Sequence, residues 1–168
     1  MKVNVKELAV MGVLTAVALI FSYVESMFAS FIPVPGVKLG LANAMILLAL
    51  FAVGKWQAFA IGLVRVLLSA LLFGNIMSLC ISLAGFLLSF FFMLLLKRTG
   101  KFSLIGISLG GGAAHNLGQL ICVSVYMSSF LMMRYIFLFS LFGVLTGLVT
   151  GFVCKLIYER VKEYDWLS

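Results

Sequence analysis

The stretch GGGAAHNLGQLI, residues 110–121, places three hydrogen-bonding side chains in a region that is otherwise apolar or small. His115 and Gln119 are four residues apart and Asn116 and Gln119 are three apart, so on a helix the three would share a face. Imidazole and amide groups both donate and accept hydrogen bonds. Such a face can orient a polar ligand, or it can tie two membrane helices together.

Further polar residues interrupt other apolar runs, namely Arg65, Glu25 and Asn43, and Lys38 lies just before one of them. An ionisable group inside a membrane is costly when unpaired, so it normally faces the bundle interior or a water-filled cavity. Arg65 can therefore bind an anionic ligand, or it can form a structural ion pair with Glu25. We predict a substrate-binding set made of Arg65, His115, Asn116, Gln119, Asn43 and Lys38.

These residues are embedded in a chain whose composition is that of an integral membrane protein. Of the 168 residues, 64% are apolar and only 10% are charged, and the mean hydropathy is +1.25. No soluble domain of this size needs so much apolar surface. We predict an all-α fold, with residues 1–168 forming one six-helix transmembrane domain.

Six apolar runs are separated by short breaks at glycine, proline, lysine or arginine. A bilayer core takes about 20 apolar residues per helix. The predicted spans are residues 7–31, 39–53, 58–73, 76–96, 104–127 and 135–158. The first run also resembles a secretory signal, but it is too long for one and no convincing cleavage site follows, so we interpret it as a retained helix.

The basic residues predict how the six spans are oriented. Arg134 and Lys38 would lie on one side, whereas the other side would carry Lys2, Lys6, Lys55, Lys97, Arg98, Lys101, Lys155, Arg160 and Lys162. Short cytoplasmic loops collect lysine and arginine, so both termini are predicted to be cytoplasmic, in a bacterial cytoplasmic membrane. This distribution accounts for the net charge of +7 without nucleic acid as a partner, since no aromatic–basic pattern accompanies it.

With this orientation, the polar residues of the spans all fall in the outer half of the membrane. The inner halves hold almost only apolar and small residues. A polar cavity that opens outward, with apolar walls, fits this one-sided distribution. The arginine and lysine predict a small anionic substrate.

Small residues recur at intervals of four on two of the spans. Gly143, Gly147 and Gly151 form a ladder in FGVLTGLVTGF, and Gly12 and Ala16 form a shorter one. Small residues let helices approach closely, so each ladder serves either packing within the fold or contact with a partner protein. The run GGG at residues 110–112 lacks the lysine of a phosphate-binding loop and follows no strand, so it too indicates close packing.

No pattern in the sequence indicates an enzyme. There is no HExxH motif, no pair of carboxylates at a useful spacing and no nucleotide-binding motif, and the single aspartate is Asp165. The cysteines Cys80, Cys122 and Cys154 have no metal-binding spacing, which favours a packing role. We expect neither catalysis nor a cofactor or metal, so active transport would need an energy source on another chain.

Three stretches, YVESMFASFIPVPGVKLGLAN, RVLLSALLFGNIMSLCISLAGFLLS and GGAAHNLGQL, resemble the Gx transporter family, also called heptaprenyl diphosphate synthase component I. That family in turn resembles the substrate-binding S components of energy-coupling factor (ECF) transporters. The resemblance implies six helices, cytoplasmic termini and an outward pocket. It also implies a coupling subunit driven by two cytoplasmic ATPases, with Gly12 and Ala16 at positions that could contact that subunit.

Two functions follow as expectations. The first is a substrate-binding membrane subunit that captures a small anionic molecule, either vitamin-like or a precursor of prenyl or quinone compounds. The second is a non-catalytic accessory or anchor subunit of an isoprenoid or redox enzyme system. The name of the family implies a prenyltransferase subunit, but this chain lacks the aspartate-rich metal motifs that prenyl diphosphate synthases need, so it would not be the catalytic one.

Overall fold

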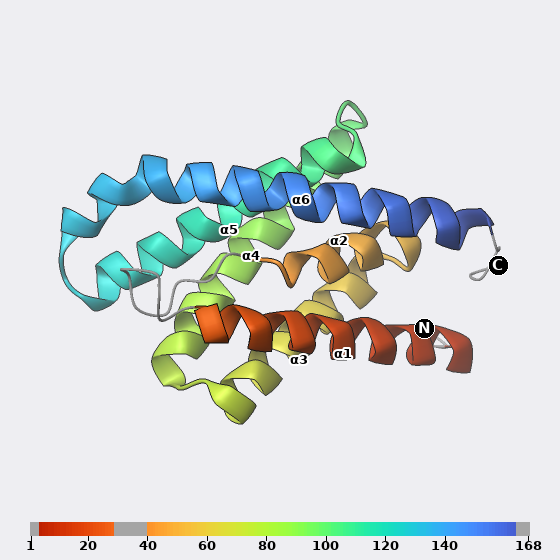
Figure 1. The fold of residues 1–168 in the computed structure, drawn as a ribbon, viewed down its shortest axis with the longest axis horizontal. Coiled ribbons are helices and arrows are strands. Elements are labelled where there is room, and N and C mark those ends of the chain that lie inside the picture. The colour runs from red at the N-terminus through yellow and green to blue at the C-terminus, as the bar shows by residue number, and fades with distance from the viewer. Residues whose placement is uncertain (1–3, 29–39, 164–168) are drawn as a thin grey trace.

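The computed structural model describes residues 4–28 and 40–163, and these are helical throughout except for short connections. Figure 1 shows the helices and the colours that identify them. Their bounds are α1 Val5–Phe28, α2 Asn43–Ala52, α3 Lys55–Phe73, α4 Ile76–Thr99, α5 Leu104–Tyr126, the 3-10 helix η2 Phe130–Tyr135, and α6 Ile136–Glu163. The described ranges contain no strand, and each predicted span corresponds to one α-helix.

Among the described residues, four helices are long and apolar enough to cross a membrane: α1, α3, α4 and α6, the last together with the residues just before it. Helix α5 has 23 residues, but its glycines and polar side chains make it less apolar than those four. Helix α2 has only 10 residues, or about 15 Å at 1.5 Å per residue. It therefore extends through about half of a hydrocarbon core of roughly 30 Å, which is less than the full crossing expected for residues 39–53.

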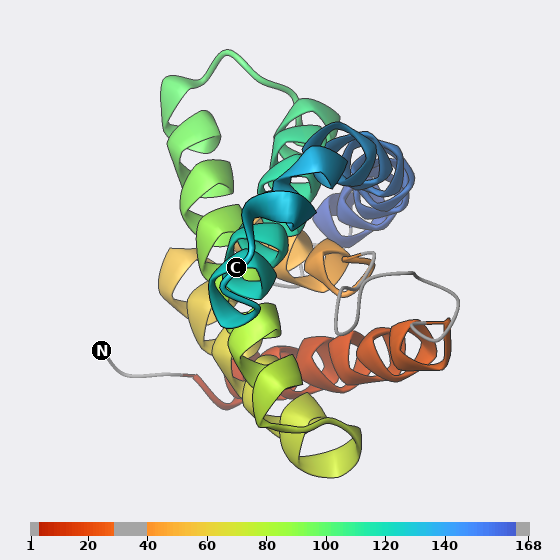
Figure 2. The same ribbon diagram turned by 90° about the vertical axis from the view of Figure 1, so that its left-hand side faces the viewer.

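Helix α2 lies at the centre of the bundle, between α1 and α6 (Figures 1 and 2), and contacts every other α-helix. Residues 43–50 are all buried. Its sequence NAMILLALFA is apolar around the whole circumference, as expected for a helix buried on all sides. The short α2 thus forms the core on which the longer helices pack.

Glycines set the spacing between α5 and α6. A Cβ atom added to Gly112 would stand 2.1 Å from the carbonyl oxygen of Gly143, and one added to Gly147 would stand 2.6 Å from the carbonyl oxygen of Ser108. Gly151 also faces Ser108, with 2.7 Å to its Cβ. The ladder of Gly143, Gly147 and Gly151 therefore packs against α5 within the fold, and does not offer a face to a partner.

The opposite side of α5 packs as closely on α4. A Cβ on Gly118 would lie 2.6 Å from the carbonyl oxygen of Ala84. Gly111 lies against Met93, and the hydroxyl of Ser89 donates to the carbonyl of Gly111 at 2.8 Å. The glycine run of residues 110–112 is thus a packing element that lets α5 pass between α4 and α6.

Several helix ends meet at one end of the bundle, which we call the basic end because Lys6, Lys55, Lys97 and Arg98 lie there. Gln57 donates to Glu7 and so joins the starts of α3 and α1. The ammonium of Lys97 donates to the carbonyl of Leu50 at 2.5 Å and lies 4.5 Å from the ring centroid of Phe51. The Phe51 ring packs edge-on against Tyr158 of α6, with the ring centroids 5.8 Å apart.

The outside of the bundle is strongly apolar. On α1, Leu8 and Ile20 are about 60% exposed, and Gly12 and Ala16 lie on the same outward face. No atom of the described structure lies within 4 Å of a Cβ placed on Gly12. Such a continuous apolar exterior fits lipid or a partner helix and does not fit water.

Candidate functional site

Arg65 of α3 is the largest fully buried side chain among the residues that the structure describes, at 1% exposure. Its Nη1 donates to the hydroxyl of Ser22 at 3.4 Å, and its charge interacts with the carboxylate of Glu25. Glu25 is itself buried and accepts a hydrogen bond from the backbone nitrogen of Leu41. These contacts tie α1, α3 and the segment leading into α2 together at one level of the bundle.

His115 and Gln119 of α5 lie against two glycines. A Cβ added to Gly85 of α4 would stand 2.8 Å from Cγ of Gln119 and 2.9 Å from Cε1 of His115. A Cβ on Gly40 would stand 3.1 Å from Cδ2 of His115. The two side chains therefore occupy space that the missing side chains of Gly40 and Gly85 leave open.

Asn43, the first residue of α2, lies beside the same glycine. Its Nδ2 is 3.3 Å from the position of a Cβ on Gly40. Its side chain is buried at 6% exposure, and neither its oxygen nor its nitrogen has a hydrogen-bond partner within the described residues. Gly40 has a φ of +91°, a conformation that favours glycine, so the turn that brings Asn43 near His115 depends on this residue type.

Residues 40 and 41 connect the two groups of side chains, because Leu41 contacts Glu25 whereas Gly40 contacts His115. The two groups of side chains together form what we call the polar cluster, which consists of Ser22, Glu25, Asn43, Arg65, His115 and Gln119. The cluster joins α1, α2, α3 and α5. The structure thus gathers most of the predicted site residues at the start of α2.

Two predicted residues are placed differently. Asn116 is turned toward α6, where its Nδ2 donates to the carbonyl of Phe139 at 2.8 Å. Successive helical residues are about 100° apart, so Asn116 faces away from the direction taken by His115 even though the two are adjacent. Lys38 lies outside the residues that the structure describes.

The structure also adds residues that the sequence analysis did not single out. Ser22 contacts Arg65, and Gly85 makes room for His115 and Gln119. Ser82, one turn before Gly85, is buried, and its hydroxyl has no partner within the described residues. Sequence spacing could have indicated these residues. Ser22 is three residues from Glu25, and Ser82 is three residues from Gly85, so the members of each pair share one helical face.

The chemistry of the polar cluster is hydrogen bonding with one buried cation and one buried carboxylate. Within the described residues, no three histidine, cysteine, aspartate or glutamate side chains come together as metal ligands would. The Nε and Nη2 groups of Arg65 have no hydrogen-bond partner there. These two donors form one edge of the guanidinium, and that edge can bind a carboxylate or phosphate through two parallel hydrogen bonds.

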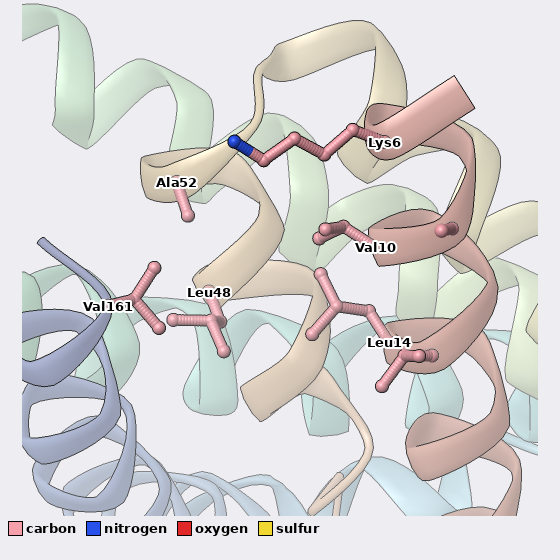
Figure 3. Close-up of a pocket in the computed structure, with 8 residues that line it drawn as sticks. Lys6, Val10, Leu14, Leu48, Ala52 and Val161 are labelled. Atoms are coloured by element: carbon pink, nitrogen blue, oxygen red, sulfur yellow. The ribbon is translucent and has the colours of Figure 1, made fainter. Parts of the chain in front are cut away.

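An apolar groove at the basic end is separate from this cluster. It has a volume of about 380 Å³ and is lined by Lys6, Ala9, Val10, Val13, Leu14, Leu48, Ala52 and Val161. Figure 3 shows Lys6 extending from α1 across the groove, with Leu48 and Ala52 of α2 and Val161 of α6 on its other side. Along α1, Val10 is 15 residues from Glu25, which is roughly 20 Å of helix.

Long apolar helices, an apolar exterior and a polar cluster buried between helices define a helical membrane protein. A family model described as heptaprenyl diphosphate synthase component I matches residues 14–157. The chain therefore belongs to this family, as the resemblance of its three sequence stretches predicted. Comparisons with curated proteins and with solved structures found no match.

Proposed function

We propose that the chain is a non-catalytic membrane subunit that binds a small anionic molecule in the polar cluster. The observation that carries this proposal is the set of buried hydrogen-bonding atoms that lack a protein partner, namely Nε and Nη2 of Arg65 and both amide atoms of Asn43. Buried polar groups are normally hydrogen-bonded, and each one left without a partner costs about 1–3 kcal/mol. A ligand with acceptor oxygens would remove this cost.

The ligand is anionic because its best partner is the open edge of the Arg65 guanidinium. Glu25 already interacts with this guanidinium, and Ser22 accepts from its Nη1. These two contacts fix the orientation of the side chain and direct its remaining donors. A carboxylate or phosphate would accept from Nε and Nη2, and Asn43, which can donate and accept, would bind a neighbouring polar group of the same ligand.

We further propose that this subunit belongs to a transporter of the ECF type, in which other subunits supply the energy. The sequence contains no nucleotide-binding motif, so a coupling subunit and cytoplasmic ATPases would drive transport. The outward face with Gly12 and Ala16 supports docking of a partner helix, because close approach needs small residues and no described atom covers Gly12. The polar cluster would open to the outside, and the basic end would face the cytoplasm.

The family description favours a second candidate, an accessory subunit of a prenyl diphosphate synthase. In that case the chain would hold a partner enzyme at the membrane, and its outward α1 face would be the contact. The two functions differ in the role of the polar cluster. A transporter subunit needs Arg65 for ligand binding, whereas an anchor needs it only for stability.

Mass spectrometry of small molecules extracted from the purified chain tests the proposal and identifies the ligand. We expect an anionic ligand that is vitamin-like or related to prenyl or quinone precursors. Arg65→Lys keeps the charge but loses the two-pronged edge, so it should weaken binding more than ten-fold, or by over 1.4 kcal/mol. Asn43→Ala should also weaken it.

A matched control is Gly12→Leu, which changes the outward face and not the polar cluster. It should leave ligand binding unchanged and should weaken association with a coupling subunit. Normal binding by both Arg65→Lys and Asn43→Ala would refute the site. Co-purification of an enzyme without any bound small molecule would instead support the accessory role.

A further inference from the structure

A second groove at the basic end is lined largely by aromatic side chains, unlike the aliphatic groove beside Lys6. It lies between the start of α3 and the end of α4, has a volume of about 270 Å³, and is lined by Lys55, Trp56, Phe59, Phe90, Phe91, Leu94 and Arg98. Two cations thus stand beside a wall of aromatic and aliphatic side chains. Lys55 is the first residue of α3 and Arg98 lies in the last turn of α4. The apolar wall comes from residues further inside the same two helices.

The two cations of this groove are available to a ligand. Lys55 and Arg98 are both exposed. Within the described residues neither Lys55 nor Arg98 forms an ion pair with a carboxylate, whereas Lys155 on α6 pairs with Glu159. The ammonium of Lys55 lies 5.6 Å from the ring centroid of Trp56. Tryptophan is enriched where a membrane meets water.

The wall of the groove is an apolar surface of packed aromatic rings. The rings of Phe59, Phe86 and Phe90 pack on one another, with centroids 5.3–5.9 Å apart. Phe90 is buried and packs against Phe91, with ring centroids 5.8 Å apart, and Phe91 is 58% exposed. The buried rings thus support one ring that faces outward. This outward position next to other exposed apolar side chains places the groove where hydrocarbon chains of the bilayer would lie.

We propose that this groove binds an anionic phospholipid, with Lys55 and Arg98 holding the phosphate and the Phe59, Phe91 and Leu94 side chains contacting an acyl chain. The charges argue for this occupant, because two unpaired cations attract an anionic headgroup and Trp56 marks its depth. Basic residues near a membrane surface each contribute attraction for anionic lipid, and basic pockets between helices bind such headgroups. The proposal does not depend on the polar cluster or its ligand.

The test measures lipid binding to the purified full chain by native mass spectrometry. The probes are phosphatidylglycerol and phosphatidylcholine with identical acyl chains. Phosphatidylglycerol should bind at least five-fold more tightly. Lys55→Gln with Arg98→Gln should weaken phosphatidylglycerol binding by roughly 25-fold, because each basic residue contributes about five-fold. It should weaken phosphatidylcholine binding much less, because the choline cation of that lipid offsets the charge of its phosphate. Both residues are exposed, so the variant should keep the helical circular dichroism of the parent.

The control Lys155→Gln with Lys162→Gln removes the same charge from α6 and should change phosphatidylglycerol binding less than two-fold. Phe91→Ala should weaken both lipids, whereas Phe152→Ala on α6, which is exposed to a similar extent at 57%, should not. Equal binding of the two lipids, or equal effects of the two charge variants, would overturn the proposal. Displacement of phosphatidylglycerol by stoichiometric geranylgeranyl diphosphate would also overturn it, in favour of a prenyl diphosphate as occupant.

Discussion

For single residues, the electrostatic interaction between Arg65 and Glu25 decides how the polar cluster behaves. Both side chains are almost fully buried, and each has a second partner, Ser22 for the arginine and the Leu41 backbone for the glutamate. Two buried opposite charges add little net stability by themselves, but loss of one of them raises the cost of burying the other. Arg65 and Glu25 therefore depend on each other for their positions in the polar cluster.

We expect Arg65→Gln to lower the free energy of unfolding by about 3–5 kcal/mol, because it removes the buried positive charge that interacts with the Glu25 carboxylate. The double variant with Glu25→Gln should lose less than the sum of the two single variants. Denaturation of all three in mixed micelles would measure this. Strictly additive losses would show that the two charges do not interact.

Gly85 offers a second test, because its missing side chain makes room for His115 and Gln119. In Gly85→Ala the new Cβ would stand under 3 Å from both side chains, and such overpacking typically costs about 1–3 kcal/mol. Gly106→Ala is the matched control on α5, since its nearest contact would be an ordinary 3.6 Å. Thermal unfolding should distinguish the two; equal midpoints would contradict the close packing of the cluster.

At the scale of elements, α5 is held on both sides by backbone contact. Gly112 and Gly143 bring α5 and α6 together, and Gly118 brings α5 against Ala84 of α4. Close helix packing in membranes depends on such small residues. The position of α5 fixes where its polar face lies, so the glycines contribute to the geometry of the site as well as to stability.

Gly112→Ala should therefore be strongly destabilising, because its Cβ would stand 2.1 Å from the Gly143 carbonyl oxygen and the backbones would have to separate. We expect a loss of at least about 2 kcal/mol in the free energy of unfolding, together with altered accessibility of α6. Gly12→Ala, which meets no described atom within 4 Å, should be neutral or stabilising, since alanine favours a helix by about 1 kcal/mol over glycine. Similar losses in both variants would contradict the packing described for α5 and α6.

At the scale of the whole molecule, the basic residues of distant helices gather at one end of the bundle. Contacts among Leu50, Phe51, Lys97 and Tyr158 bring the ends of α2, α4 and α6 together, and Gln57 joins the start of α3 to α1. Lysine and arginine collect on the cytoplasmic side of membrane proteins. The clustering at one end supports a cytoplasmic position for that end, and this orientation stays a prediction.

Single cysteines introduced at Lys101 and Arg134, in a variant whose three native cysteines are replaced, would test the orientation. In intact cells, the position at Arg134 should react with a membrane-impermeant maleimide and the position at Lys101 should be protected until the cells are opened. Labelling of both positions in intact cells would place them on the same side and remove the outward orientation of the polar cluster.

Local composition was enough to predict the helices and the type of protein. Apolar runs broken by glycine, proline and basic residues predicted all six helices, because helix formation in an apolar solvent depends on local composition and length. The family resemblance was confirmed over residues 14–157. Three hydrogen-bonding residues on one helix predicted a polar face, and in the structure His115 and Gln119 both lie against Gly85.

Which of those residues meet depends on how the helices pack on one another. Spacing along α5 could not separate His115 from Asn116, but packing between α4 and α6 turns the first toward Gly85 and the second toward Phe139. Depth in a predicted span could not show that Asn43 starts a ten-residue helix at the centre of the bundle. It also could not show which glycine ladder is internal, since Gly143 and Gly12 occur in similar patterns. The physical reason is that the 3.6-residue period gives the relative direction of side chains on one helix, whereas the rotation and position of each helix depend on close contacts between all of them.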